Sequence, residues 1–370
     1  MRRASLLLLC LLGVACGDRR PATGLDVSSA LGGEAAAGFA RASEPRRFAF
    51  PEDHNAHRAF RNEWWYFTGQ LATADGEGFG YQVTFFRIAL APAAPGRSSA
   101  WATRQVWMAH VALSAIDAGA HWHGERFARA ALGLAGQQAR PFRVWLEDWQ
   151  VTGGEGGSFP WELAVATEDF TLALSLSPER DPLLQGDEGL SQKSAEAGNA
   201  SYYYSITRLA TAGAITVGGE RHTVTGRSWL DREWSTSALG ADQAGWDWFS
   251  LQLDNGADLM VYRLRQKDGS TDRHSAGTLL GADGRRQALA AGDFQLQPRR
   301  WWRSEDGTRY PVAWRLQVPG AGLDLRVEAL LDDQVMDTAV RYWEGAVSVA
   351  EADSDRTLGR GYLEMTGYRP

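Results

Sequence analysis

The chain has 370 residues, of which 44% are hydrophobic and 22% are charged, and its formal net charge is −7. These values are typical of a soluble globular protein, and an acidic chain without basic runs is not expected to bind nucleic acid. The length fits two domains or one large all-β unit. Two residue types are unusually frequent, since the chain contains 16 Trp and 41 Gly.

The first segment has the pattern of an export signal. Arg2 and Arg3 precede an apolar run from Leu6 to Val14, which is shorter than the roughly 20 residues of a membrane span. Small residues then lead to Cys16, which resembles the lipobox of bacterial lipoproteins, where the cysteine becomes the lipidated first residue. We predict a signal peptide over residues 1–15 and a lipid anchor at Cys16. The alternative is cleavage after Ala15 and plain secretion.

The two cysteines of the chain, Cys10 and Cys16, both lie in this segment. Disulfides, Cys-ligated zinc and thiol catalysis are therefore excluded for the folded part of the protein. Residues 16–43 are rich in Ala, Gly and Ser without a β period, which is typical of a flexible tether. We expect the protein in the bacterial cell envelope, facing the periplasm from the outer membrane in preference to the inner one.

The remaining chain has the pattern of strands. From Asn62 onward apolar residues mostly alternate with polar ones, as in Tyr81–Arg87 and Leu259–Arg265. Pairs such as Asp75-Gly76 and Asn255-Gly256 recur between these runs and indicate hairpins. Convincing helix patterns are scarce, so we predict an all-β protein.

The sequence also contains a weak internal repeat. Trp64–Leu71 aligns without gaps with Trp246–Leu253, and Gly226–Asp231 aligns with Gly359–Glu364. Since the matching segments occur in the same order, we predict two related β domains, at residues 44–235 and 236–370.

Several phrases together resemble one known family. They are Phe50–His54, Arg61–Gly69, Ser228–Trp234, Gly245–Phe249 and Tyr342–Gly345. On these residues the chain resembles the bacterial AttH-like family, which includes the carotenoid 1,2-hydratases and is described as having two lipocalin-like domains. The resemblance implies two consecutive lipocalin-like barrels that bind or carry a hydrophobic or amphipathic, isoprenoid-like molecule. It also implies an association with an ABC-type exporter.

One position departs from the hydratases of that family. In those hydratases the segment that corresponds to Ser228–Trp234 carries a histidine beside the aspartate. In this chain Asp231 is followed by Arg232 and then by Glu233 and Trp234. Arginine does not exchange protons near neutral pH, because its pKa exceeds about 12. The resemblance therefore predicts the shape of a pocket more strongly than it predicts carotenoid hydration.

Hydration of an isoprenoid double bond needs no cofactor, because a carboxylic acid can protonate the alkene and water can capture the resulting cation. Burial keeps such an acid protonated, and aromatic faces stabilise the cation by about 0.5–2 kcal/mol each. Asp231 and Glu233 are the candidate proton donors of this alternative function, a cofactor-free hydratase. Their other role would be to pair with Arg227, Arg232 or Arg263 in the barrel wall.

The candidate ligand-binding residues are aromatic or acidic and lie mostly in the same phrases. They are Glu63, Trp65, Tyr66, Tyr202, Tyr204, Trp234, Trp246, Trp248, Tyr262, Trp343 and Glu344. Tyr202 and Tyr204 share one strand face, whereas Tyr203 takes the other.

We predict neither a metal nor a cofactor, since His121 and His123 have no nearby acidic cluster or cysteine. A secreted hydrolase is a third alternative, but the chain has no Gly-x-Ser-x-Gly motif.

Overall fold

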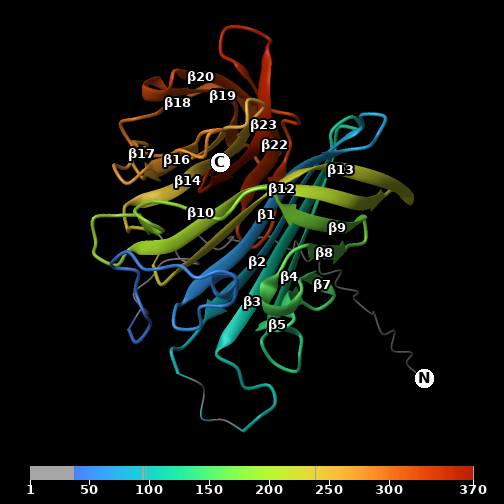
Figure 1. The fold of residues 1–370 in the computed structure, drawn as a ribbon, viewed down its shortest axis with the longest axis vertical. Helices are drawn as coiled ribbons and strands as arrows, with labels where there is room; N and C mark the ends of the chain where they lie inside the picture. Colours follow the sequence, from blue (N-terminus) through green and yellow to red (C-terminus); the bar gives the residue numbers. More distant parts are fainter. Residues whose placement is uncertain (1–36, 94–95, 97, 238, 370) are drawn as a thin grey trace, which may run out of the picture.

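The computed structural model describes residues 37–93, 96, 98–237 and 239–369, and their backbone consists almost entirely of antiparallel strands (Figure 1). In these ranges the helical elements are three single turns, η1 (Glu52–His54), η2 (Glu155–Gly157) and η3 (Pro319–Ala321). None of the described helices is long and apolar enough to cross a membrane. The predicted signal peptide and Cys16 lie outside the described residues.

The first sheet has 13 strands, in the order β4-β3-β2-β1-β13-β12-β9-β8-β7-β6-β5, with β10 and β11 added to β12. Its strands are β1 (Asn62–Ala72), β2 (Gly78–Ala89), β3 (Gln105–Ala115), β4 (Ala120–Arg129), β5 (Ala135–Ala139), β6 (Phe142–Leu146), β7 (Trp149–Thr152), β8 (Trp161–Ala166), β9 (Phe170–Pro178), β10 (Leu183–Leu184), β11 (Leu190–Gln192), β12 (Ala200–Val217) and β13 (Glu220–Ser235).

The second sheet has 10 strands, in the order β17-β16-β15-β14-β23-β22-β20-β19-β18, with β21 added to β22. Its strands are β14 (Gln243–Leu253), β15 (Asp258–Gln266), β16 (Ala276–Leu280), β17 (Arg286–Ala290), β18 (Gln295–Arg303), β19 (Arg309–Val318), β20 (Leu323–Ala329), β21 (Val335–Met336), β22 (Tyr342–Glu351) and β23 (Thr357–Thr366).

Each sheet curls into a nearly closed barrel in which the first strand pairs with the last. β1 pairs with β13, and β14 pairs with β23. The repeated segments of the sequence occupy these four strands. Trp64–Leu71 lies in β1 and Trp246–Leu253 in β14, whereas Gly226–Asp231 lies in β13 and Gly359–Glu364 in β23. The predicted all-β class with two lipocalin-like barrels is confirmed.

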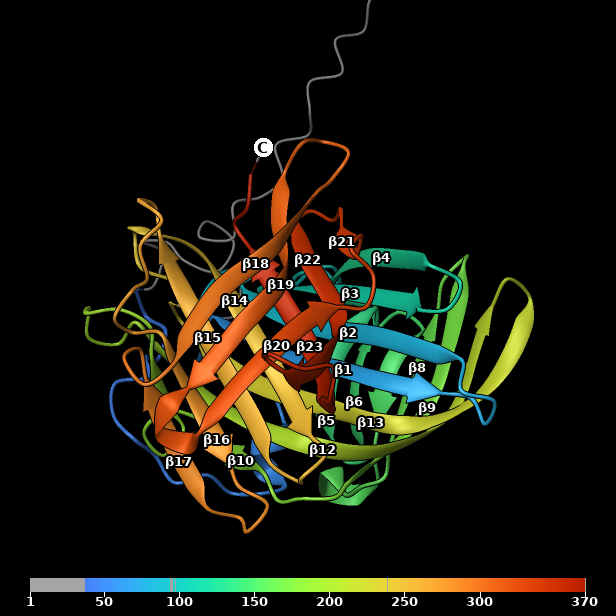
Figure 2. The same cartoon turned by 90° about the horizontal axis from the view of Figure 1, so that it is seen from above.

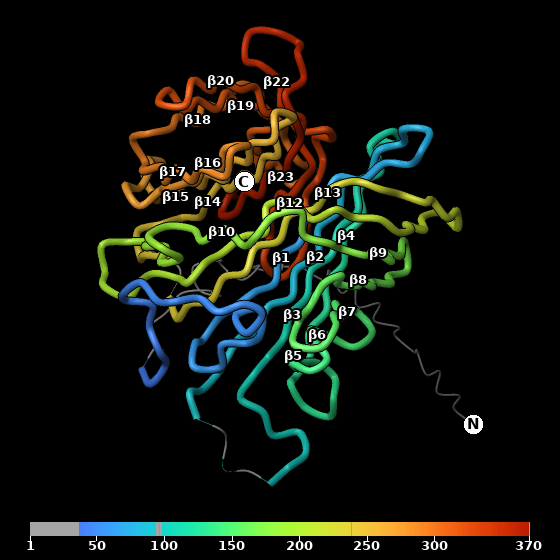
Figure 3. The backbone as a smooth tube through the Cα atoms, in the orientation of Figure 1, coloured from blue at the N-terminus to red at the C-terminus, as the bar shows by residue number. Residues whose placement is uncertain are grey.

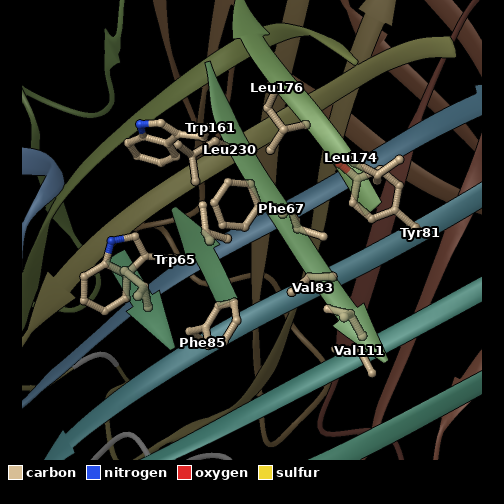
Figure 4. Close-up of a cluster of buried hydrophobic side chains, with 14 of the residues drawn as sticks. Trp65, Phe67, Tyr81, Val83, Phe85, Val111, Trp161, Leu174, Leu176 and Leu230 are labelled. Atoms are coloured by element: carbon tan, nitrogen blue, oxygen red, sulfur yellow. The ribbon is translucent and has the colours of Figure 1, made fainter. Parts of the chain in front are cut away.

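Each barrel has its own hydrophobic core. The larger core fills the first barrel, and Figure 4 shows Trp65 and Phe67 of β1 packed with Phe85, Trp161 and other buried side chains. The second barrel encloses a separate core around Phe249 and Trp314. Ala42 is buried against the first core, and the Ala40 amide donates to the Ala59 carbonyl at 2.9 Å, so the end of the predicted tether packs against this domain.

A third buried cluster lies between the two barrels. Figure 1 shows β22 and β23 above β1 and β2, and Figure 2 shows the same strands close together from above; β2 contacts β22, and β1 contacts β23. Figure 3 shows β12 passing close to β14, which it also contacts. The cluster includes Tyr66 and Tyr203 from the first barrel and Trp248, Tyr262 and Tyr362 from the second. Strands β1, β12 and β13 are therefore covered on both faces.

Candidate functional site between the two barrels

A cavity of about 80 Å³ lies at the interface of the two barrels. One ordered water needs about 10–15 Å³ by the same measure, so the cavity has room for several waters or for one end of a larger molecule. Much of its wall is aromatic, and these side chains are Trp64, Tyr66, Phe86, Tyr203, Trp246, Trp248, Tyr262 and Tyr342. Its charged residues are Lys193, Asp231, Glu233, Glu344 and Glu364.

The alternation of side chains along each strand decides which residues reach the cavity. On β13, Asp231 and Glu233 line the cavity, whereas Leu230 and Trp234 belong to the core of the first barrel. The two candidate proton donors therefore lie together in the cavity wall.

Asp231 is 3% exposed and accepts several hydrogen bonds from neutral donors. Ser205 Oγ and Trp229 Nε1 donate to Oδ1 at 2.5 and 2.6 Å, and the Tyr203 hydroxyl donates to Oδ2. Burial raises the pKa of Asp231 to about 7, although the three hydrogen bonds oppose the rise. Since Oδ1 already accepts two bonds, Oδ2 is the oxygen that can carry a proton.

Glu233 is neutralised by a buried cation. Lys193 Nζ lies 3.1 Å from Glu233 Oε1 and 4.3 Å from the ring centre of Tyr262, and Ser201 donates to the same carboxylate oxygen. The charge of Glu233 raises the pKa of Lys193 against the opposing effect of burial, so the ammonium form persists. Glu233 is thus an ion-pair partner in the cavity wall.

Glu344 and Glu364 form a second acidic pair, which the second barrel contributes to the cavity wall. They are direct cross-strand partners on β22 and β23, and Trp246 Nε1 donates to Glu364 Oε1 at 2.8 Å. Burial and repulsion between the two carboxylates raise the pKa of Glu344 well above its usual value. Burial also raises the pKa of Glu364, to about 8, with Asp231 and Glu233 adding repulsion.

Asp231 and Glu364 occupy equivalent positions in the internal repeat. Each is the last residue of its repeated segment in β13 or β23. Each is also the cross-strand partner of an aromatic residue on the first strand of its barrel, Tyr66 for Asp231 and Trp248 for Glu364. The rings of Tyr66 and Trp248 themselves meet edge to face, with centroids 5.3 Å apart. The cavity thus receives one carboxyl group from each barrel at matching places.

The structure brings some of the predicted ligand-binding residues to the cavity and not others. Tyr66, Trp246, Trp248, Tyr262 and Glu344 line it. The others are not among the lining residues: Trp65, Tyr202, Tyr204 and Trp234 belong to the core of the first barrel, Trp343 belongs to the core of the second, and Glu63 is buried in an ion-pair network.

That network also contains Arg232, the residue at which the sequence departs from the hydratases. Arg232 Nη2 lies 3.3 Å from Glu63 Oε2, and its guanidinium carbon lies 3.8 Å from the ring centre of Trp65. Arg87 also pairs with Glu63, and these cations hold the pKa of Glu63 well below its usual range despite burial. Arg232 does not line the cavity, so it is separated from the carboxyl groups there.

Sequence reasoning did not select Lys193, Tyr203 or Glu364, all of which line the cavity. Two of these three residues have a signal in the sequence. Lys193 is one of only two lysines in the chain, and Glu364 aligns with Asp231 in the internal repeat. Among the described residues, no group of three or more His, Cys, Asp or Glu is arranged to hold a metal ion.

Comparison with known proteins gives a family and a fold. The AttH-like family model matches residues 41–368. A crystal structure of a Nitrosomonas europaea protein assigned as an AttH is 38% identical, covers 90% of this chain and all of its own, and has a TM-score of 0.81. Among curated proteins, none matches the sequence significantly.

Two more distant solved structures share the fold. Kievitone hydratase from Nectria haematococca has a TM-score of 0.65 at 15% identity, covering 89% of this chain and 98% of its own. CghA has a TM-score of 0.54 at 13% identity, covering 91% and 97%. At these identities the likeness extends to the fold alone.

Proposed function

The chain belongs to the AttH-like family, and we propose that it binds an apolar, unsaturated molecule between its two barrels and hydrates it without a cofactor. The observation that carries this proposal is Asp231, a carboxyl group with a pKa near neutrality in an aromatic cavity. A hydratase among the proteins with this fold supports the proposal, since it shows that the fold is compatible with hydration.

Asp231 is suited to donate a proton to a double bond. A general acid is most effective when its pKa lies near the working pH. Tyr203 is bonded to Oδ2 and accepts a hydrogen bond from Trp248 Nε1 at 3.2 Å, which fixes the orientation of the acid. The aromatic wall would stabilise the resulting cation by about 0.5–2 kcal/mol for each well-placed ring.

The first test measures binding and turnover on one set of compounds. Purified protein is titrated with fatty alcohols and isoprenoids, including farnesol and squalene, and the intrinsic Trp fluorescence is followed. We expect quenching, because Trp64, Trp246 and Trp248 line the cavity. Failure of every compound to bind would contradict the proposal.

The same compounds are then incubated with the protein, and their hydration is measured by mass spectrometry. We expect Asp231→Asn to lose hydration by at least about 100-fold, the usual contribution of a positioned general acid, while still binding ligand. Turnover should fall tenfold per pH unit above about 7, where Asp231 loses its proton. Asp75→Asn, in an exposed turn, is the matched control. Undiminished hydration by Asp231→Asn would remove Asp231 from the mechanism.

A second candidate function is binding and carrying without turnover, by a lipid-anchored protein of the cell envelope that works beside an ABC-type exporter. The aromatic cavity supports binding equally well, because small-molecule pockets are mostly apolar with a few placed polar groups. Mass spectrometry of protein extracted from its own membrane tests both parts. It detects a lipid on Cys16 and any co-purifying molecule.

A further inference from the structure

Glu344 and Glu364 are buried acids for which the described part of the chain supplies no cation. Glu344 is 3% exposed, and its Oε2 atom has no hydrogen-bond partner among the described residues. The donors to Glu364 are neutral groups, the indole of Trp246 and the hydroxyl of Tyr66. A buried carboxylate normally has a charged partner or several donors, since an unpaired buried charge is costly. The two carboxyl groups can therefore accept further hydrogen bonds or a positive charge from a bound molecule, and both line the cavity.

The cavity wall already contains one buried positive charge, the ammonium group of Lys193. Glu233 faces the Lys193 ammonium, which lies over the ring of Tyr262. The Glu344–Glu364 pair has comparable surroundings, with Tyr66, Trp246 and Tyr342 also in the wall, but the matching ammonium is missing from the described residues. Glu233 and its neighbouring ring thus have a cation partner, whereas the Glu344–Glu364 pair has none among the described residues.

Two carboxyl groups that face each other in an apolar wall cannot both be ionised at neutral pH. Burial and mutual repulsion keep both carboxyl groups protonated near neutral pH, and a positive charge placed beside them would allow one of them to ionise. A negative charge beside aromatic faces attracts a cation more strongly in a dry cavity than in water, because the local dielectric constant is lower.

We propose that the Glu344–Glu364 pair is a subsite for a positive charge on the bound molecule, and that a tertiary ammonium group is the stable ligand class that fits it. In the proposed hydration the same subsite would face the carbocation, and this part of the inference rests on the proposed function.

The reaction balances without an oxidant or a reductant. The π electrons of the alkene form a C–H bond with the proton of Asp231, which leaves a carboxylate and a tertiary carbocation. The oxygen of a water molecule forms the C–O bond, and one of its O–H bonds breaks. The Asp231 carboxylate takes up this proton, which restores the acid, so alkene and water give alcohol.

The test compares a charged and an uncharged ligand of similar length, decyldimethylamine and decanol, by Trp fluorescence titration at pH 7. We expect the wild-type protein to bind the amine at least tenfold more tightly, which corresponds to about 1.4 kcal/mol. Glu344→Gln and Glu364→Gln should each reduce that preference to less than threefold, while each variant still binds decanol. Decanol binding also reports that each variant is folded.

The controls separate this inference from the proposed function. Asp75→Asn should keep the amine preference, and so should Asp231→Asn, although it loses hydration. Equal binding of the two ligands by the wild-type protein would overturn the cation subsite and leave the apolar cavity in place. A preference that persists in both glutamine variants would also overturn it. Failure of both ligands to bind would overturn the subsite and the proposed ligand cavity together.

Discussion

Asp231 and Glu364 illustrate how a small change of environment alters the chemistry of an ordinary carboxyl group. Both are buried in the same cavity wall, and burial raises both pKa values into the range where a proton can be given or taken at neutral pH. Glu63 is equally buried, but Arg87 and Arg232 keep its pKa low. The presence of a guanidinium partner, not the degree of burial, separates an ion-pair acid from a candidate proton donor.

These raised pKa values predict a pH dependence of stability. Glu364 has a pKa of about 8 in the folded protein, whereas an unfolded glutamate titrates near 4.5. Between these values the unfolded chain releases a proton that the folded chain retains, so the free energy of unfolding falls as pH rises from about 4.5 to 8.

Glu364→Gln should remove much of this dependence. We expect the wild-type protein to lose on the order of a few kcal/mol more than the variant between pH 5 and pH 8, measured by urea denaturation at each pH. Asp75→Asn should follow the wild-type curve. Parallel pH profiles for wild type and Glu364→Gln would show that Glu364 titrates normally.

At the scale of the strand, alternation separates neighbours into different environments. Tyr203 points into the cavity and donates to Asp231, while Tyr204 points into the first barrel, where its hydroxyl lies 2.6 Å from His54 Nδ1. Burial lowers the pKa of His54 to about 3, so this imidazole is neutral and forms a structural hydrogen bond.

This separation predicts different effects for two adjacent substitutions on β12, one on stability and the other on the pKa of Asp231. Tyr204→Phe should cost about 1–2 kcal/mol of stability through the lost buried hydrogen bond, with ligand affinity unchanged. Tyr203→Phe should raise the pKa of Asp231 further, because the Tyr203 bond lowers it, and should shift the alkaline limit of turnover to higher pH. Urea denaturation and a pH–rate profile measure the two effects. An altered ligand affinity in Tyr204→Phe would contradict this assignment of faces.

At the scale of the whole molecule, the two barrels meet through matching contacts. Gln70 Nε2 donates to the carbonyls of Val347 and Gly361 at 2.9 and 2.6 Å. Gln252, its partner in the repeat, donates to the carbonyls of Thr207 and Ser228 at 2.7 and 3.1 Å. Ser228 and Gly361 are themselves equivalent in the repeat, so each barrel donates a glutamine hydrogen bond to the same position of the other barrel.

We expect Gln70→Ala and Gln252→Ala to destabilise the protein by similar amounts, about 1–3 kcal/mol each, because each removes two hydrogen bonds to backbone carbonyls of the other barrel. Both should also weaken ligand binding, since the cavity wall comes from both barrels. Urea denaturation and decanol titration provide the measurements. If either variant keeps full decanol affinity despite a measured loss of stability, the contacts do not shape the cavity.

The sequence alone determined the strand class, the two-barrel fold and the family, because alternation, turn residues and the repeated phrases are local features. It also selected Asp231 and Glu233, which the cavity brings together. It correctly placed Tyr202 and Tyr204 on one face and Tyr203 on the other, but it did not identify the face that lines the cavity.

Only the tertiary structure decided that point. In a sheet with one wet face, polar residues mark the outside; β1, β12 and β13 instead have a barrel core on one face and the second barrel on the other. Aromatic residues therefore occur on both faces, and period two alone cannot show which face binds. The pairing of Glu344 with Glu364 likewise depends on the register between β22 and β23. That register, and the docking of the two barrels, create the cavity from residues far apart in the chain.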